Sequence, residues 1–162
     1  MKLVMATADF LVAGRTFAGF PLLLDDDGWP MEPAQSFLWH TLITHGGVES
    51  TLTWEAYGRR LYDYFAFLAA NELQWDEAQK PHGLSVVTRY RDWSLGELAL
   101  SPNTVNKRLN LIVRFYDWCK RQGYITQLPF GVRDVRTPAH HGFLAHVDRS
   151  GGVVQKPAIM AR

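Results

Sequence analysis

The sequence predicts an all-α domain built mainly from four helices. Three observations indicate this class: four segments with helical spacing of apolar residues, breaker residues between these segments, and a globular composition. The 162 residues are 47% hydrophobic and 20% charged, which excludes the disordered and fibrous classes. A single cysteine, Cys119, excludes an internal disulfide and fits a reducing, cytoplasmic compartment. No apolar run reaches the roughly 18 residues of a membrane helix, so no membrane partner is expected.

Residues 1–32 are expected to form an irregular N-terminal arm. Short apolar runs at 3–5, 10–12 and 21–24 favour extended pieces, with Gly14 and Gly19 as breaks. The run of three aspartates and a glycine at 25–28 is typical of a turn. Because this run lacks the acid spacing and closing glutamate of a calcium loop, no metal site is predicted there.

The helical domain is expected to span residues 33–130. The first helix is predicted over about 33–45, from Pro33 to the glycines that follow His45. The second is predicted from Ser50 or Thr51 as cap to about Asn71. Its apolar residues fall on one face: Trp54, Tyr57, Leu61, Phe65 and Leu68. A breaker-rich linker at 79–83 then precedes a third helix over about 86–95.

The fourth helix has the clearest start and stop signals. Ser101 suits an N-cap, Pro102 suits the first helical position, and Gly123 suits the residue that follows the last turn. The apolar face between them is expected to be core: Val105, Leu109, Ile112, Tyr116 and Cys119, widened by Leu111, Phe115 and Trp118. Pro129 ends the helical region, and residues 131–162 are expected to form a linker with little periodicity.

Charge is distributed unevenly along the chain, although the net charge is only +1. Residues 1–50 carry a net −4 and residues 51–100 a net −2, whereas residues 101–162, with ten bases and three acids, carry +7. Such asymmetry indicates a basic surface for an anionic partner such as nucleic acid, or else a tail that is basic by chance.

Part of this basic charge falls on one side of the fourth helix, roughly opposite its apolar face. The residues on that side are Asn103, Lys107, Asn110, Arg114 and Arg121. Arginine can grip a phosphate or a guanine with two hydrogen bonds, and asparagine can pair in the same way with adenine. The pattern fits a helix that contacts DNA, and it also fits an ordinary solvated face.

Other chemistry is weakly supported. The cluster of His140, His141 and His146 matches no common zinc spacing, and Cys119 falls on a core face rather than in a reactive setting. No phosphate loop, nucleophile elbow or carboxylate pair is found. We therefore predict no catalytic residue, no metal and no cofactor in this chain. Two rival hypotheses stay open: a helical protein-interaction module without DNA binding, and a small enzyme that uses the histidine cluster.

Two stretches resemble one known family. Ser50-Thr51-Leu52-Thr53 through Tyr57, Leu61, Phe65, Phe67 and Leu68 resembles the opening helix of the core-binding domain of phage integrases and tyrosine recombinases. SPNTVNKRLNLIVRFYDWCKRQGYITQLPF, residues 101–130, resembles that domain's last main helix, with an aromatic pair, a glycine and a proline in the expected order. The resemblance covers about residues 33–130, and Phe143-Leu144-Ala145-His146 resembles the linker of some members.

The resemblance implies a four-helix, SAM-like domain of two crossed helical hairpins that clamps one face of duplex DNA. It implies DNA integration or site-specific recombination, with this protein's own C-terminal catalytic domain and further recombinase protomers, usually four, as partners. Lys107, Arg108 and Arg114 would contact phosphates, and Asn103, Thr104 and Asn110 would contact base edges. Arg121 extends the same side of the helix, and Arg59 and Arg60 on the second helix would add backbone contacts.

The sequence departs from the family's catalytic pattern. His146-Val147-Asp148-Arg149 spells the family's H-x-x-R motif, but no tyrosine follows Tyr124 that could act as the nucleophile. We therefore interpret the H-x-x-R match as chance, and we expect strand cleavage to come from a catalytic domain that these 162 residues do not include.

Overall fold

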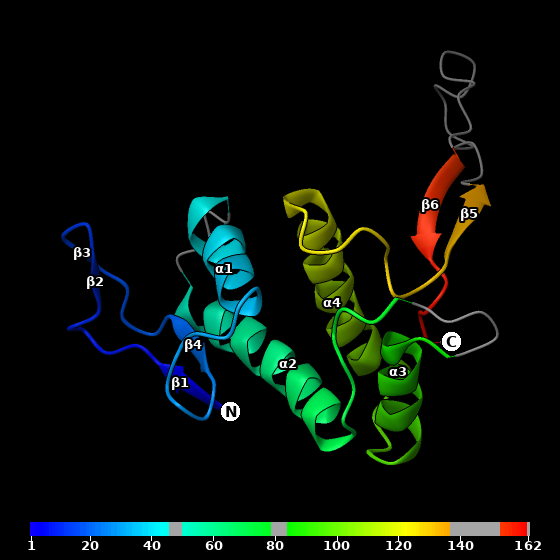
Figure 1. Ribbon diagram of the computed structural model, residues 1–162, viewed down its shortest axis with the longest axis horizontal. Coiled ribbons are helices and arrows are strands. Elements are labelled where there is room, and N and C mark those ends of the chain that lie inside the picture. Colours follow the sequence, from blue (N-terminus) through cyan, green and yellow to red (C-terminus); the bar gives the residue numbers. More distant parts are fainter. Residues whose placement is uncertain (46–49, 79–83, 137–152, 162) are drawn as a thin grey trace, which may run out of the picture.

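A computed structural model describes residues 1–45, 50–78, 84–136 and 153–161 of the chain (Figure 1). Its main elements are the helices α1 (Ala34–Trp39), α2 (Thr51–Ala70), α3 (Val86–Gly96) and α4 (Pro102–Gln122). The helices α2 and α4 are central, because each of them contacts all three of the other helices. The predicted four-helix, largely α-helical architecture is therefore confirmed, and small strands accompany it.

The first predicted helix has two parts. After α1 the chain widens into a π-helical turn, η1 (His40–Thr44), which the backbone N–H of His45 closes by donating to the carbonyl of His40 at 2.9 Å. The expected span of 33–45 was thus right in extent and wrong in assuming one regular helix. Single π-helical turns are rare and frequently occur at functional sites.

The predicted ends of α4 are confirmed. The Ser101 side chain accepts a hydrogen bond from the backbone N–H of Thr104 at 3.3 Å, and Pro102 is the first helical residue. Gly123 has a φ of +83°, a left-handed conformation that a residue without Cβ adopts at little cost. Ser85 caps α3 in the same way, whereas the Ser50 side chain accepts no hydrogen bond at the start of α2.

The N-terminal segment is more regular than the expected arm. The strands β1 (Lys2–Met5) and β4 (Pro21–Leu24) pair antiparallel and both contact α2, and the short strands β2 (Leu11–Val12) and β3 (Arg15–Thr16) form a second pair. The predicted turn at 25–28 is present: the Asp25 carboxylate accepts backbone hydrogen bonds from Asp27 and Trp29. Alternating burial along β4 explains its regularity, since one of its faces packs on the helices.

One hydrophobic core joins these parts. Its largest fully buried side chains come from the helices and from β4 with the residue before it: Tyr64, Tyr90, Tyr116, Phe20, Phe37, Phe115, Leu23 and Leu38. The phenol of Tyr116 donates to the backbone carbonyl of Trp75 at 2.6 Å and therefore accepts from the phenol of Tyr64 at 2.7 Å. Burial raises the pKa of both phenols, so they stay protonated hydrogen-bonding groups.

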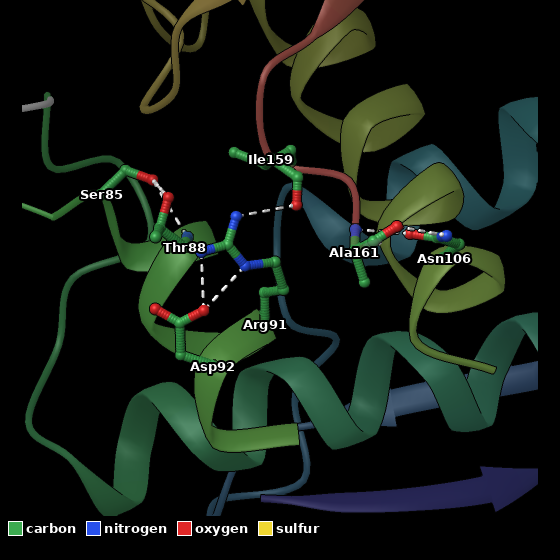
Figure 2. Close-up of polar contacts among 7 residues, drawn as sticks. All are labelled: Ser85, Thr88, Arg91, Asp92, Asn106, Ile159 and Ala161. Atoms are coloured by element: carbon green, nitrogen blue, oxygen red, sulfur yellow. Dashed lines mark hydrogen bonds and ion pairs between the residues drawn. The ribbon is translucent and has the colours of Figure 1, made fainter. Parts of the chain in front are cut away.

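The C-terminal residues return to the helices. The strands β5 (Val132–Arg136) and β6 (Val153–Pro157) pair antiparallel, although the sequence predicts only a linker there. Beyond β6, the Asn106 side chain forms two hydrogen bonds with the backbone of Ala161, at 2.8 and 3.0 Å (Figure 2). The Arg91 guanidinium donates to the carbonyl of Ile159, whose side chain is buried. We call residues 158–161 the C-terminal strap.

Candidate nucleic-acid interface

The exposed face of α4 carries the row of polar side chains that the sequence predicts. All five are exposed and lie on one side of the helix; we call them the α4 row: Asn103, Lys107, Asn110, Arg114 and Arg121. The buried residues of α4, such as Val105 and Leu109, lie on the other side. At a rise of about 1.5 Å per residue the row extends about 27 Å along the helix axis. The whole helix carries five basic residues and one acid, Asp117.

Arg114 is held in place while its guanidinium stays exposed. It donates to the hydroxyl of Tyr57 on α2 at 2.8 Å, and its Cζ lies 5.7 Å from the centre of the Tyr57 ring. A tyrosine orients the guanidinium without neutralising its charge. The arginine therefore keeps both its charge and further donors for an anion.

Two predicted contact residues of α4 take part in contacts within the protein. Arg108 is only partly exposed; it forms an ion pair with Asp63 on α2 at 3.1 Å and donates to the hydroxyl of Tyr90 on α3 at 3.2 Å. It thereby ties three helices together. Thr104 is exposed, but its hydroxyl shares a hydrogen bond with Ser101 in the N-terminal cap of α4.

The two predicted arginines of α2 differ. Arg59 is exposed and forms an ion pair with Glu55 one turn earlier, at 2.7 Å. Arg60 lies three residues after Tyr57 and three before Asp63, the two α2 residues that contact the arginines of α4. This spacing places Arg60 on the side of α2 that faces α4. Arg60 is thus on the α2 side that faces α4 by its spacing, whereas Arg59 is paired with Glu55.

A groove lies at the C-terminal end of the α4 row. It has a volume of about 530 Å³ and is lined by residues of α1, η1, α2 and α4: Phe37, His40, Thr41, Leu42, His45, Thr53, Tyr57, Arg114, Asp117, Trp118 and Arg121. The rings of His40 and His45 have centroids 4.3 Å apart, and His40 also lies against Trp118 at 5.8 Å. We call this cavity the histidine groove.

The sequence pattern indicates only Arg114 and Arg121 as binding residues of this groove. It assigns Tyr57 to the core stripe and gives no role to His40, His45, Thr53 or Asp117. No local pattern could have joined them, because they come from segments up to about 80 residues apart in the chain. The π-helical turn that contains His40 is the structural feature that indicates a functional site at this groove.

The groove alters the protonation of two of its groups. Burial, the neighbouring His45 and the cation of Arg121 together lower the pKa of His40 below its usual value of 6.5. Burial raises the pKa of Asp117, although Arg121 and Lys120 act in the opposite direction. Both shifts reduce the charge that these side chains carry at a given pH.

The part of the chain that the structure describes contains no group of three histidine, cysteine or acidic residues placed to hold a metal ion. Three features of the sequence lie outside the described residues: the cluster of His140, His141 and His146, the linker resemblance at 143–146, and the H-x-x-R match at His146 and Arg149. Cys119 is buried, and burial raises the pKa of its thiol to about 12. Among the described helices, none is both long and apolar enough to cross a bilayer.

Comparison with known proteins gives a family match over the helical part of the chain. Residues 38–123, from the end of α1 through the last residue of α4 and Gly123, match the family described as "Phage integrase, N-terminal SAM-like domain". No curated protein and no solved structure shows significant similarity to the chain. The family match covers more than half of the chain and includes the complete α4 row and most of the groove. The chain therefore belongs to the family of phage integrase N-terminal SAM-like domains, the DNA-binding core-binding domains of tyrosine recombinases.

Proposed function

We propose that this chain binds duplex DNA through the α4 row during DNA integration or site-specific recombination. The observation that carries the proposal is the state of Lys107 and Arg114. Both are exposed on the same face of α4, and neither forms an ion pair with a carboxylate of the described residues. Cations that are left unpaired and aligned on one helix suit the regularly spaced phosphates of a duplex.

The residues divide by chemistry. Lys107, Arg114 and Arg121 would neutralise phosphates, with Arg60 adding charge from α2. Asn103 and Asn110 lie between the cations of the row and have side-chain amides that suit base edges. Arg108, because of its ion pair with Asp63, and Thr104, because of its role in the cap, contribute less. Arg59 contributes least, since Glu55 already neutralises it.

Strand cleavage and rejoining would come from a C-terminal catalytic domain of the same protein, acting with further protomers on the DNA. A protein-interaction module without DNA binding would be favoured if carboxylates neutralised Lys107 and Arg114. Arg114 instead contacts the uncharged Tyr57 hydroxyl. The large apolar side chains that are exposed, such as Leu11, Trp29 and Leu52, come from separate parts of the chain rather than from one helix.

Fluorescence anisotropy with a labelled duplex tests the proposal. The protein should bind duplex DNA at low salt, and the logarithm of the affinity should fall linearly with the logarithm of the salt concentration. Replacing Lys107 and Arg114 by alanine should weaken binding and reduce the salt slope by about 2, because about two phosphate contacts are lost. Asn110→Ala should instead change the preference among DNA sequences more than the salt slope.

Arg89→Gln is the matched control. Arg89 is an exposed base on α3, so its replacement removes one positive charge without touching the α4 row. This variant should bind with nearly unchanged affinity and slope. Absence of binding at low salt, or an equal loss in Arg89→Gln and Lys107→Ala, would contradict a specific role for the α4 row.

A further inference from the structure

We propose that the histidine groove is a phosphate-binding subsite of the DNA interface, and that His40 and His45 make its affinity for DNA depend on pH. The inference rests on the proposed DNA binding and deepens it, because it assigns a ligand group and a regulation to one end of the α4 row. The groove itself is defined by the residues of α1, η1, α2 and α4 that line it, independently of any DNA.

The lining of the groove matches the chemistry of a phosphodiester. Arg114 and Arg121 supply permanent positive charge and paired N–H donors. The Tyr57 hydroxyl accepts from Arg114 and so keeps its own proton to donate. Thr53 adds a second hydroxyl, and the buried Trp118 has an indole N–H without a hydrogen-bond partner among the described residues. The two arginines and the hydroxyls of Tyr57 and Thr53 can donate to a phosphate oxygen once DNA lies along the α4 row.

The two histidines add charge that depends on pH. In the protein alone the pKa of His40 is lowered, firstly by burial and then by His45 and Arg121, so His40 is mostly neutral at pH 7. A phosphate anion in the groove would offset the repulsion from His45 and Arg121, and its negative charge would favour the imidazolium form of His40. Binding of DNA would therefore be coupled to the uptake of a proton by the His40 imidazole. Affinity must then rise as the pH falls toward 6 and decline as the pH rises through the histidine pKa of the complex.

Every charged or titratable group that lines the groove affects whether the affinity for DNA rises or falls with pH. Arg114 and Arg121 supply the cationic side chains of the lining, and Tyr57 supplies a hydroxyl. Asp117 is the one acid among the lining residues, and its carboxylate would repel a phosphate. Because its pKa is raised, protonation of Asp117 at low pH also favours binding. The experiment must therefore separate Asp117 from the histidine pair.

The test measures the affinity for a short duplex between pH 6 and 8 at constant ionic strength. The wild-type affinity should rise by about tenfold on going from pH 8 to pH 6. This is the change expected when binding takes up one proton and raises the pKa of the protonated group by about one unit. The double variant His40→Gln, His45→Gln should lose most of this dependence. Asp117→Asn should bind several-fold more tightly at pH 7 and keep the dependence. Arg89→Gln should behave as the wild type does.

A second measurement does not depend on the variants folding. The ring protons of His40 and His45 are titrated by NMR in the wild-type chain, with sodium sulfate against sodium chloride at matched ionic strength. Sulfate keeps its charge over this pH range and serves as the probe for a phosphate. The pKa of His40 should be higher in sulfate than in chloride. Equal pKa values in the two salts would overturn the subsite.

The outcomes distinguish the two proposals. If the wild type binds no DNA at low salt, the proposed function fails, while a sulfate-dependent rise in the His40 pKa would still support the subsite. If DNA binds with a pH dependence that persists in the double histidine variant, the subsite is overturned and DNA binding by the α4 row stands.

Discussion

Gly58 sets the distance between α2 and the N-terminal strands. A Cβ at this position would lie 2.4 Å from the Cβ of Pro21 and 3.3 Å from a side-chain carbon of Leu3. The strands β1 and β4 can lie directly on the helix only because this atom is missing. The glycine is thus required by close packing, although it sits in the middle of a helix, where glycine is otherwise unfavourable.

Gly58→Ala should destabilise the protein despite the higher helix propensity of alanine. Propensity alone would add about 0.5–1 kcal/mol of stability, but overpacking against the Pro21 ring should cost about 1–3 kcal/mol. We expect a lower free energy of unfolding in urea titrations. Gly96→Ala is the control, since a Cβ at this position, at the end of α3, would meet no atom within 4 Å. That variant should be neutral or more stable, and a stabilised Gly58→Ala would contradict the close approach.

The Tyr64–Tyr116 pair allows a second prediction about single residues. Tyr116→Phe removes the acceptor of Tyr64 and the donor to the Trp75 carbonyl, whereas Tyr64→Phe removes only one donor. Leaving a buried polar group unpaired costs about 1–3 kcal/mol. Chemical denaturation should therefore show a larger loss of stability for Tyr116→Phe than for Tyr64→Phe. Equal losses, or the reverse order, would show that the direction of the hydrogen bonds is wrong.

At the scale of elements, the sequence predicts what local chemistry determines. The cap at Ser101, the first-turn Pro102 and the left-handed Gly123 each act within a few residues, so both ends of α4 could be read from the sequence. The pairing of β5 with β6 joins residues some 20 positions apart, and no local period reveals it. The same limit applies to Arg108: its place on the helix was predictable, but its ion pair with Asp63 was not.

The C-terminal strap depends on one side chain of α4. The Asn106 amide accepts from the backbone N–H of Ala161 and donates to its carbonyl, as a neighbouring strand would (Figure 2). Asn106→Ala should therefore speed hydrogen exchange of the Ala161 amide by about tenfold, the equivalent of about 1.4 kcal/mol. Asn110→Ala, on the exposed face of the same helix, is the control and should leave this exchange unchanged. Unaltered exchange in Asn106→Ala would mean that other contacts hold the strap.

At the scale of the whole molecule, the basic residues are concentrated in one part of the chain, whereas the core residues come from nearly its whole length. The basic charge is concentrated in residues 101–162, where α4 supplies the proposed DNA contacts. The hydrophobic core extends from Ala6 to Ile159. Binding can therefore be altered by substitutions on one helix face, whereas stability depends on segments from both ends of the chain.

Removal of residues 1–24 tests whether the N-terminal strands and the helices share one hydrophobic core. Phe17 and Phe20 pack edge-to-face on Trp39 at 5.0 and 5.3 Å, and Phe20 and Leu23 are fully buried. Burial of such side chains contributes about 1.5–3 kcal/mol each, and whole domains are stable by only about 5–15 kcal/mol. The shortened chain should therefore lose its cooperative thermal transition in circular dichroism, whereas the full chain should show one transition by both circular dichroism and tryptophan fluorescence. A shortened chain that unfolds at the same temperature as the full chain would show that β1–β4 form a separate arm, and the helices would then carry their stability alone.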